Sequence, residues 1–276
     1  MPLLDAANLV TKVILYAASL GAIGAALHGM LGLMANRRAY FWFAGLVAIA
    51  AILRLVILNA QMGGSLGAAF SAAQFGWTWA GGGRPALSLV SGAVCLAVAG
   101  FFQHRALLAL AAMSISASFA LTGHSAGLEA PGLAPLIVAV HLLIAGFWLA
   151  APATLWPRLA MQDADVLART ETFSRVARMI VPFLFLSGVY LFWRINGGFS
   201  GTLSSGYGQL LIAKLLAATL VLGLGALNMT MITRKLIRQP VKGRAALRAT
   251  LRIDAILFAA IVSLIAAATT VSGPTV

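Results

Sequence analysis

Two histidines and one methionine are the side chains of this sequence best suited to bind a metal ion. His141 lies inside a stretch without charge, from Leu133 to Trp156, where an ionisable side chain is costly unless it has a partner. His124 and Met62 lie at the ends of two other apolar runs. Imidazole and thioether together suit Cu(I), a soft cation. We therefore expect a shared metal site of His124, His141 and Met62; the alternative is structural histidines and a space-filling methionine.

The remaining polar residues within or beside apolar runs have simpler interpretations. We expect His104 to be a solvated turn residue, and His28 to make an interhelical hydrogen bond rather than bind a metal. Arg54 and Lys214 have no acidic residue near them in the sequence. Their long side chains can reach the bilayer surface, which we favour over a role in an anion or carbonyl site. Asp254 is expected to pair with a basic neighbour.

The composition is that of an integral membrane protein in contact with the lipid bilayer. The chain of 276 residues is 61% hydrophobic and 9% charged, whereas soluble domains are about one quarter charged. The net charge of +13 does not indicate a nucleic-acid partner, because the basic residues fall in short segments between apolar runs. Cys95, as the single cysteine, excludes an intrachain disulfide. No phosphate-binding loop, GxSxG elbow or HExxH motif is present, so we do not expect an enzyme.

We expect an all-α fold: a single polytopic domain over residues 1–276 that forms a bundle of eight transmembrane helices. A bilayer span needs about 20 mostly apolar residues. The first run is too long for the apolar region of a signal peptide, so we expect it to be a span. The predicted spans lie near residues 8–34, 39–62, 84–102, 106–123, 133–156, 177–196, 207–233 and 250–272.

The positions of the basic residues predict the orientation of the bundle. Most of the 19 Lys and Arg residues fall in connections on one side of the eight-span arrangement. Cytoplasmic loops carry an excess of such residues, so both termini are expected on the periplasmic side. His124, Met62 and His141 then lie in the outer half. The fourth and fifth spans have a short connection, so we expect antiparallel neighbours that can share a site.

Several short motifs follow one another from Gln61 to the C-terminus. They are Met62-Gly63, Gln74-Phe75-Gly76, Gly123-His124-Ser125, His141-Leu142-Leu143 with Trp148, Phe173-Ser174, Ser187-Gly188-Val189, Tyr207 to Leu211 with Lys214, and Ala226-Leu227-Asn228. Together they resemble the copper resistance protein D (CopD) family of bacterial inner-membrane proteins. The resemblance implies copper transport across the inner membrane, often beside a periplasmic copper chaperone of the CopC type. It also implies that His124 and His141 are the positions that matter most.

The chain departs from the family pattern at three places. Ala150-Ala151 replaces a Gly-Gly pair, Asp254 stands where glutamate is usual, and Tyr16 where relatives often carry histidine. These departures leave open a different site that uses His28. Two other functions are kept as alternatives: a haem-binding or redox membrane protein, in which histidines ligate the iron axially, and an assembly partner of a copper enzyme.

Overall fold

The structure is a computed structural model that describes residues 3–34, 36–123, 125–195 and 206–271. All regular structure in these ranges is helical, as predicted. The elements are α1 (Leu3–Met30), α2 (Arg38–Met62), η1 (Leu66–Phe70), η2 (Ala72–Gln74), α3 (Phe75–Phe102), α4 (Arg105–Ala120), α5 (Ala134–Leu149), α6 (Ala151–Thr154), α7 (Asp163–Ile195), α8 (Gly206–Leu227), η3 (Asn228–Ile232), α9 (Thr233–Arg238) and α10 (Pro240–Val271).

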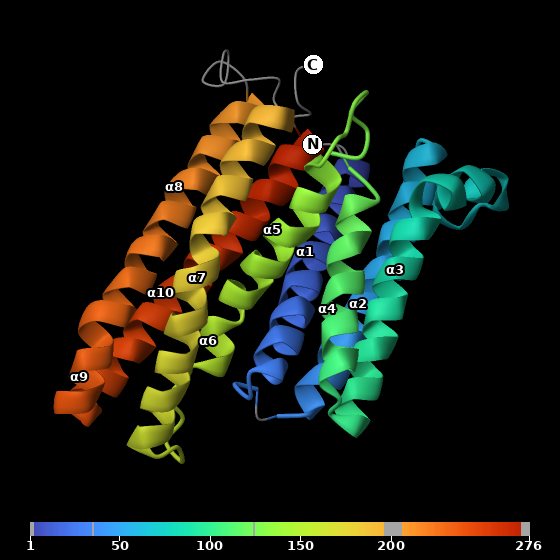
Figure 1. Ribbon diagram of the computed structural model, residues 1–276. Coiled ribbons are helices and arrows are strands. Elements are labelled where there is room, and N and C mark those ends of the chain that lie inside the picture. The colour runs from blue at the N-terminus through green and yellow to red at the C-terminus, as the bar shows by residue number, and fades with distance from the viewer. Residues whose placement is uncertain (1–2, 35, 124, 196–205, 272–276) are drawn as a thin grey trace.

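The helices are long and apolar enough to cross a membrane several times. Seven helical segments of the described chain meet this criterion, and α4 is a shorter apolar helix of 16 residues. At 1.5 Å per residue α4 is about 24 Å long, and it lies alongside the longer helices (Figure 1). The chain is therefore a multi-pass membrane protein, and the predicted helical bundle is confirmed.

Three helices begin well before the apolar runs that predicted them. α3 begins at Phe75 rather than near 84, α7 at Asp163 rather than near 177, and α10 at Pro240 rather than near 250. Hydropathy marks only the part of a helix that suits hydrocarbon, whereas backbone hydrogen bonding continues into more polar turns. Acidic side chains in the first turn of α7 favour its N-terminus. Proline at the start of α10 lacks only an N–H that would be unpaired there.

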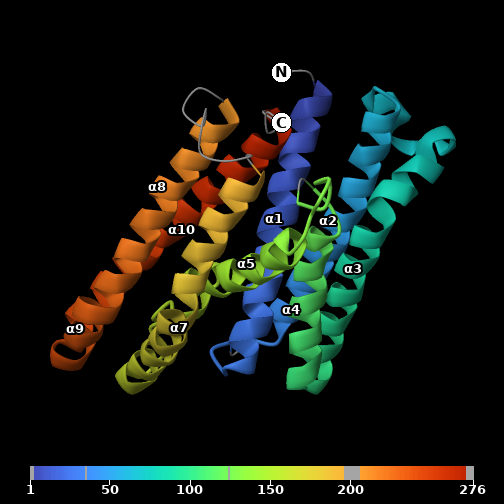
Figure 2. The same cartoon turned by 45° about the horizontal axis from the view of Figure 1, so that its top comes forward.

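α1 and α5 lie between two groups of helices. α2, α3 and α4 lie on one side, and α7, α8 and α10 on the other (Figures 1 and 2). α4 and α5 pack together, as their short connection predicted. A Cβ atom on Gly24 of α1 would lie 2.3 Å from the carbonyl oxygen of Gly146 of α5. The two backbones therefore touch, a close approach that small residues permit in membrane helices.

The first described residue of α1 and the last of α10 lie at the same end of the bundle (Figure 1). The connections from α1 to α2, α3 to α4, α6 to α7 and α9 to α10 lie at the other end. These connections and the helical turns beside them carry most of the basic residues. We call the end where α1 begins the outer end and the opposite end the inner end. These names follow the orientation predicted from the basic residues.

Candidate functional site

A hydrogen bond to a serine holds His141 of α5 against α7. His141 Nδ1 lies 2.9 Å from Ser187 Oγ, which itself donates to the carbonyl oxygen of Leu184 at 2.9 Å. Because serine has one hydroxyl hydrogen, its oxygen accepts from Nδ1–H of a neutral imidazole. Nε2 then keeps its lone pair, which is the form of histidine that binds metals. The arrangement therefore leaves His141 able to act as a ligand through Nε2.

Two further residues form the surroundings of His141. A Cβ on Gly188 would meet His141 Cε1 at 3.5 Å, so the imidazole packs directly against this turn of α7. Lys214 of α8 lies near enough to interact electrostatically with the ring. Lys214 forms no ion pair within the described ranges. It therefore places an amine without an acidic partner in the described ranges beside the histidine.

Of the other two predicted ligands, Met62 is the one that the structure describes. Met62 is the last residue of α2 and is 52% exposed. α2 packs mainly on α1 and α3, whereas α5, which carries His141, packs mainly on α1, α4 and α7. His124 lies outside the described residues. No group of three or more His, Cys, Asp or Glu side chains that could hold a metal occurs in the described part of the chain, so the three-residue site stays a prediction.

His28 makes the interhelical hydrogen bond that the sequence predicted. Its Nδ1 lies 2.7 Å from Thr154 Oγ1 of α6, and the threonine hydroxyl also bonds the carbonyl oxygen of Ala150 at 2.9 Å. The imidazole is completely buried and lies 4.7 Å from the ring of Phe147 and 5.8 Å from that of Phe173, centroid to centroid. His28 therefore connects α1 to the region where α5 ends.

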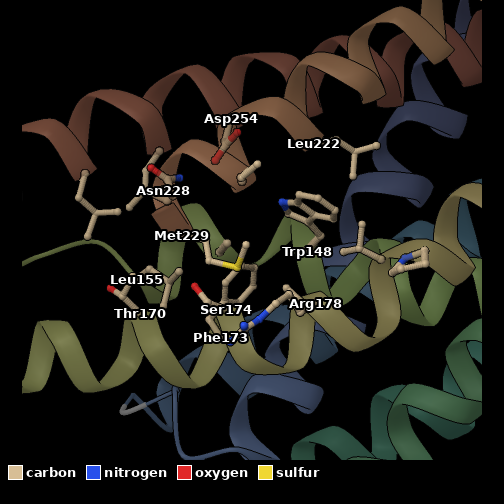
Figure 3. A pocket seen from close by; sticks show the side chains of 18 residues that line it. Trp148, Leu155, Thr170, Phe173, Ser174, Arg178, Leu222, Asn228, Met229 and Asp254 are labelled. Atoms are coloured by element: carbon tan, nitrogen blue, oxygen red, sulfur yellow. The ribbon is translucent and has the colours of Figure 1, made fainter. Parts of the chain in front are cut away.

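A cavity of about 230 Å³ lies among α5, α6, α7, α8, η3 and α10. Figure 3 shows its labelled side chains, with Asp254 of α10 and Arg178 of α7 on opposite sides. Trp148, Phe173, Ser174 and Asn228, all members of the ordered motifs, line this cavity together with Met229, Asp254 and Arg178. Ala226, of the same motif as Asn228, lines it too, so the fold brings five residues from motifs far apart in the sequence to one place.

Local backbone features shape the wall formed by α8 and η3. A Cβ on Gly225 would lie 2.9 Å from Trp148 Cζ2, so the indole packs on α8 where no side chain intervenes. η3 is a π-helical segment, and such segments are frequent at functional sites. Asn228 opens it, and its Oδ1 accepts a 2.6 Å hydrogen bond from Thr250 of α10. η3 and α10 are therefore fixed to each other beside the cavity.

Asp254 lacks the ion pair that the sequence led us to expect. It is 2% exposed, and its Oδ1 has no hydrogen-bond partner among the described residues. The ion pair found in the described ranges joins Arg244 to Asp163. The prediction was wrong because nearness in sequence does not place a basic side chain on the buried face of α10. Sequence reasoning also missed Met229 as a cavity residue, although it follows directly on the motif that ends at Asn228.

Arg54 is held by neutral groups near the outer end. Its Nη1 donates to Asn8 Oδ1 at 2.7 Å and to Thr11 Oγ1 at 3.3 Å, both on α1. Lys12, one residue further along α1, donates to the carbonyl oxygen of Thr269 on α10. These two cations therefore connect α1 to α2 and to α10, which is a structural role.

Comparison with known proteins finds a family match in the second half of the bundle. The family model described as Copper resistance protein D matches residues 167–268, which extend from α7 to α10 and include Ser187, Asn228 and Asp254. No curated protein and no solved structure matches the chain. His141 and Trp148 precede the matched segment in sequence, yet they contact it through Ser187 and Gly225. The match over residues 167–268 therefore supports the resemblance to the copper resistance protein D family that the ordered motifs predicted.

Proposed function

We propose that this copper resistance family protein carries copper across the bacterial inner membrane. Copper enters at the outer end as Cu(I), bound by His141 with His124 and Met62, and leaves at the inner end. By the positive-inside rule the outer end faces the periplasm. A periplasmic copper chaperone of the CopC type supplies the ion there.

The observation that carries this proposal is the state of His141. Its Nδ1 is hydrogen-bonded to Ser187. Nε2 keeps its lone pair for a metal ion, in a half-buried position between apolar helices. Neutral imidazole and thioether ligands favour Cu(I) over the harder Mg²⁺ and Ca²⁺. Ligating histidines usually donate their other ring N–H to a neighbouring acceptor, and Ser187 supplies that acceptor within the family segment.

No observation favours the haem alternative. Axial ligation by two histidines needs both rings to face one iron. His28 is bound to Thr154 and enclosed by Phe147 and Phe173 near the inner part of α1. His141 is instead bound to Ser187 of α7. These two histidines therefore belong to separate environments.

The test is the copper content of the purified protein and of cells that express it. We expect copper to copurify with the wild type and to be reduced in His141→Ala. His104→Ala is the matched control, because His104 is an exposed turn residue at the inner end. Absence of bound copper, with no change in cellular copper on deletion, would refute transport. A Soret absorption band would favour haem, and a metal-free protein that copurifies with a copper enzyme would favour an assembly role.

A further inference from the structure

Asp254 differs from every other acidic residue of the chain. All six acidic residues lie in the described ranges, and Asp254 is the buried one. Its Oδ1 has no hydrogen-bond partner in the part of the chain that the structure describes. Burying a carboxylate without a partner is costly, and in membrane proteins such residues mark ion or proton pathways. Asp254 therefore needs a cation or a proton from outside the described side chains.

The cavity beside Asp254 contains a sulfur ligand. Met229 lines the same cavity, and Figure 3 shows its side chain between Asp254 and Arg178. Arg178 also borders the cavity, but its side chain is exposed and forms no ion pair with Asp254. Trp148 contributes an aromatic wall, which attracts cations.

We propose that Asp254 and Met229 form a second Cu(I) site, which receives the ion after His141. This inference rests on the proposed copper transport and adds to it a stopping place in the inner half. The thioether selects a soft ion, whereas Mg²⁺ and Ca²⁺ require several oxygen ligands. Asp254 is the one acidic residue of the cavity lining, and its carboxylate supplies the negative charge that a monovalent cation needs.

The chain provides matched controls for both ligands. Met231 lies two residues after Met229 in the same π-helical segment and is 63% exposed. Asp165, in the first turn of α7, is also exposed. We therefore compare Met229→Leu with Met231→Leu, and Asp254→Asn with Asp165→Asn. Using two independent ligand variants keeps the test decisive if one of them folds poorly.

The experiment measures Cu(I) binding to the full-length protein in detergent, by competition with a Cu(I) chelator. We expect the wild type to bind two copper ions, and His141→Ala to lose the outer one. Asp254→Asn and Met229→Leu should each weaken the inner site by roughly tenfold or more, because a contact to a charged group is lost or a soft ligand is removed. The two control variants should bind copper as the wild type does.

The outcomes separate this inference from the proposed transport. If Asp254→Asn and Met229→Leu bind as much copper as the wild type while His141→Ala binds less, the inner site is wrong and transport stands. Asp254 would then hold a proton. If the wild type binds no copper, both proposals are wrong.

Discussion

Replacing Gly24 of α1 by alanine tests the packing that positions His141. The added Cβ would lie 2.3 Å from the carbonyl oxygen of Gly146 and 2.6 Å from Cβ of Ala150. Because Cβ contacts shorter than 3.0 Å essentially never occur, α1 and α5 must separate by at least about 0.7 Å at this point. The carbonyl belongs to a helix backbone, so no side-chain rotation relieves the clash. Overpacking of this kind costs about 1–3 kcal/mol.

Alanine also has an intrinsic advantage over glycine in a helix of about 0.5–1 kcal/mol, and a control must remove it. Gly45 of α2 provides that control, since nothing lies within 4 Å of a Cβ built there. We expect Gly45→Ala to match or exceed the wild type in free energy of unfolding, and Gly24→Ala to fall below it. The difference between the two variants then measures the clash alone.

The assay is equilibrium unfolding of each variant in mixed micelles, followed by circular dichroism. His141 and Trp148 are on α5, so Gly24→Ala should also lower copper binding at a temperature where the variant is folded. A variant as stable as Gly45→Ala would refute the close approach of α1 and α5. It would also remove the packing argument for the position of His141.

Two more predictions concern the residues around His141 and the cavity. Ser187→Ala should weaken Cu(I) binding at His141 by about tenfold, measured by chelator competition, whereas Ser187→Thr should largely restore it; equal affinities for both variants would mean that the hydrogen bond does not orient the imidazole. Gly225→Leu should push Trp148 into the cavity, because even a Cβ there lies 2.9 Å from the indole. Radioactive copper uptake should fall in that variant but not in Gly223→Leu, where nothing lies within 4 Å of a Cβ; uptake unchanged by Gly225→Leu would exclude the cavity from the copper path.

The helices were predictable from sequence, because hydrocarbon demands a continuous run of apolar side chains. The hydrogen bond of His28 was predictable for a related reason, since a buried imidazole needs a partner. The cavity was not predictable. Its wall combines Trp148, Phe173, Asn228 and Asp254 from different helices, and one sequence does not state which faces of those helices meet. Helix starts were also misplaced, because polar first turns resemble loops when only hydropathy is considered.

The positions of His141 and Trp148 on α5 connect the two proposed copper sites. The two residues are seven positions apart, which corresponds to two helical turns on one face and about 10 Å along the axis. α7 also reaches from His141 to the cavity, because its Ser187 bonds His141 and its Phe173 lines the cavity. A bare cation cannot cross such a distance between apolar walls without a ligand to receive it. A carrier that takes copper at His141 therefore requires a second ligand set further in. Of the cavity side chains, Asp254 and Met229 offer the carboxylate and the thioether for it.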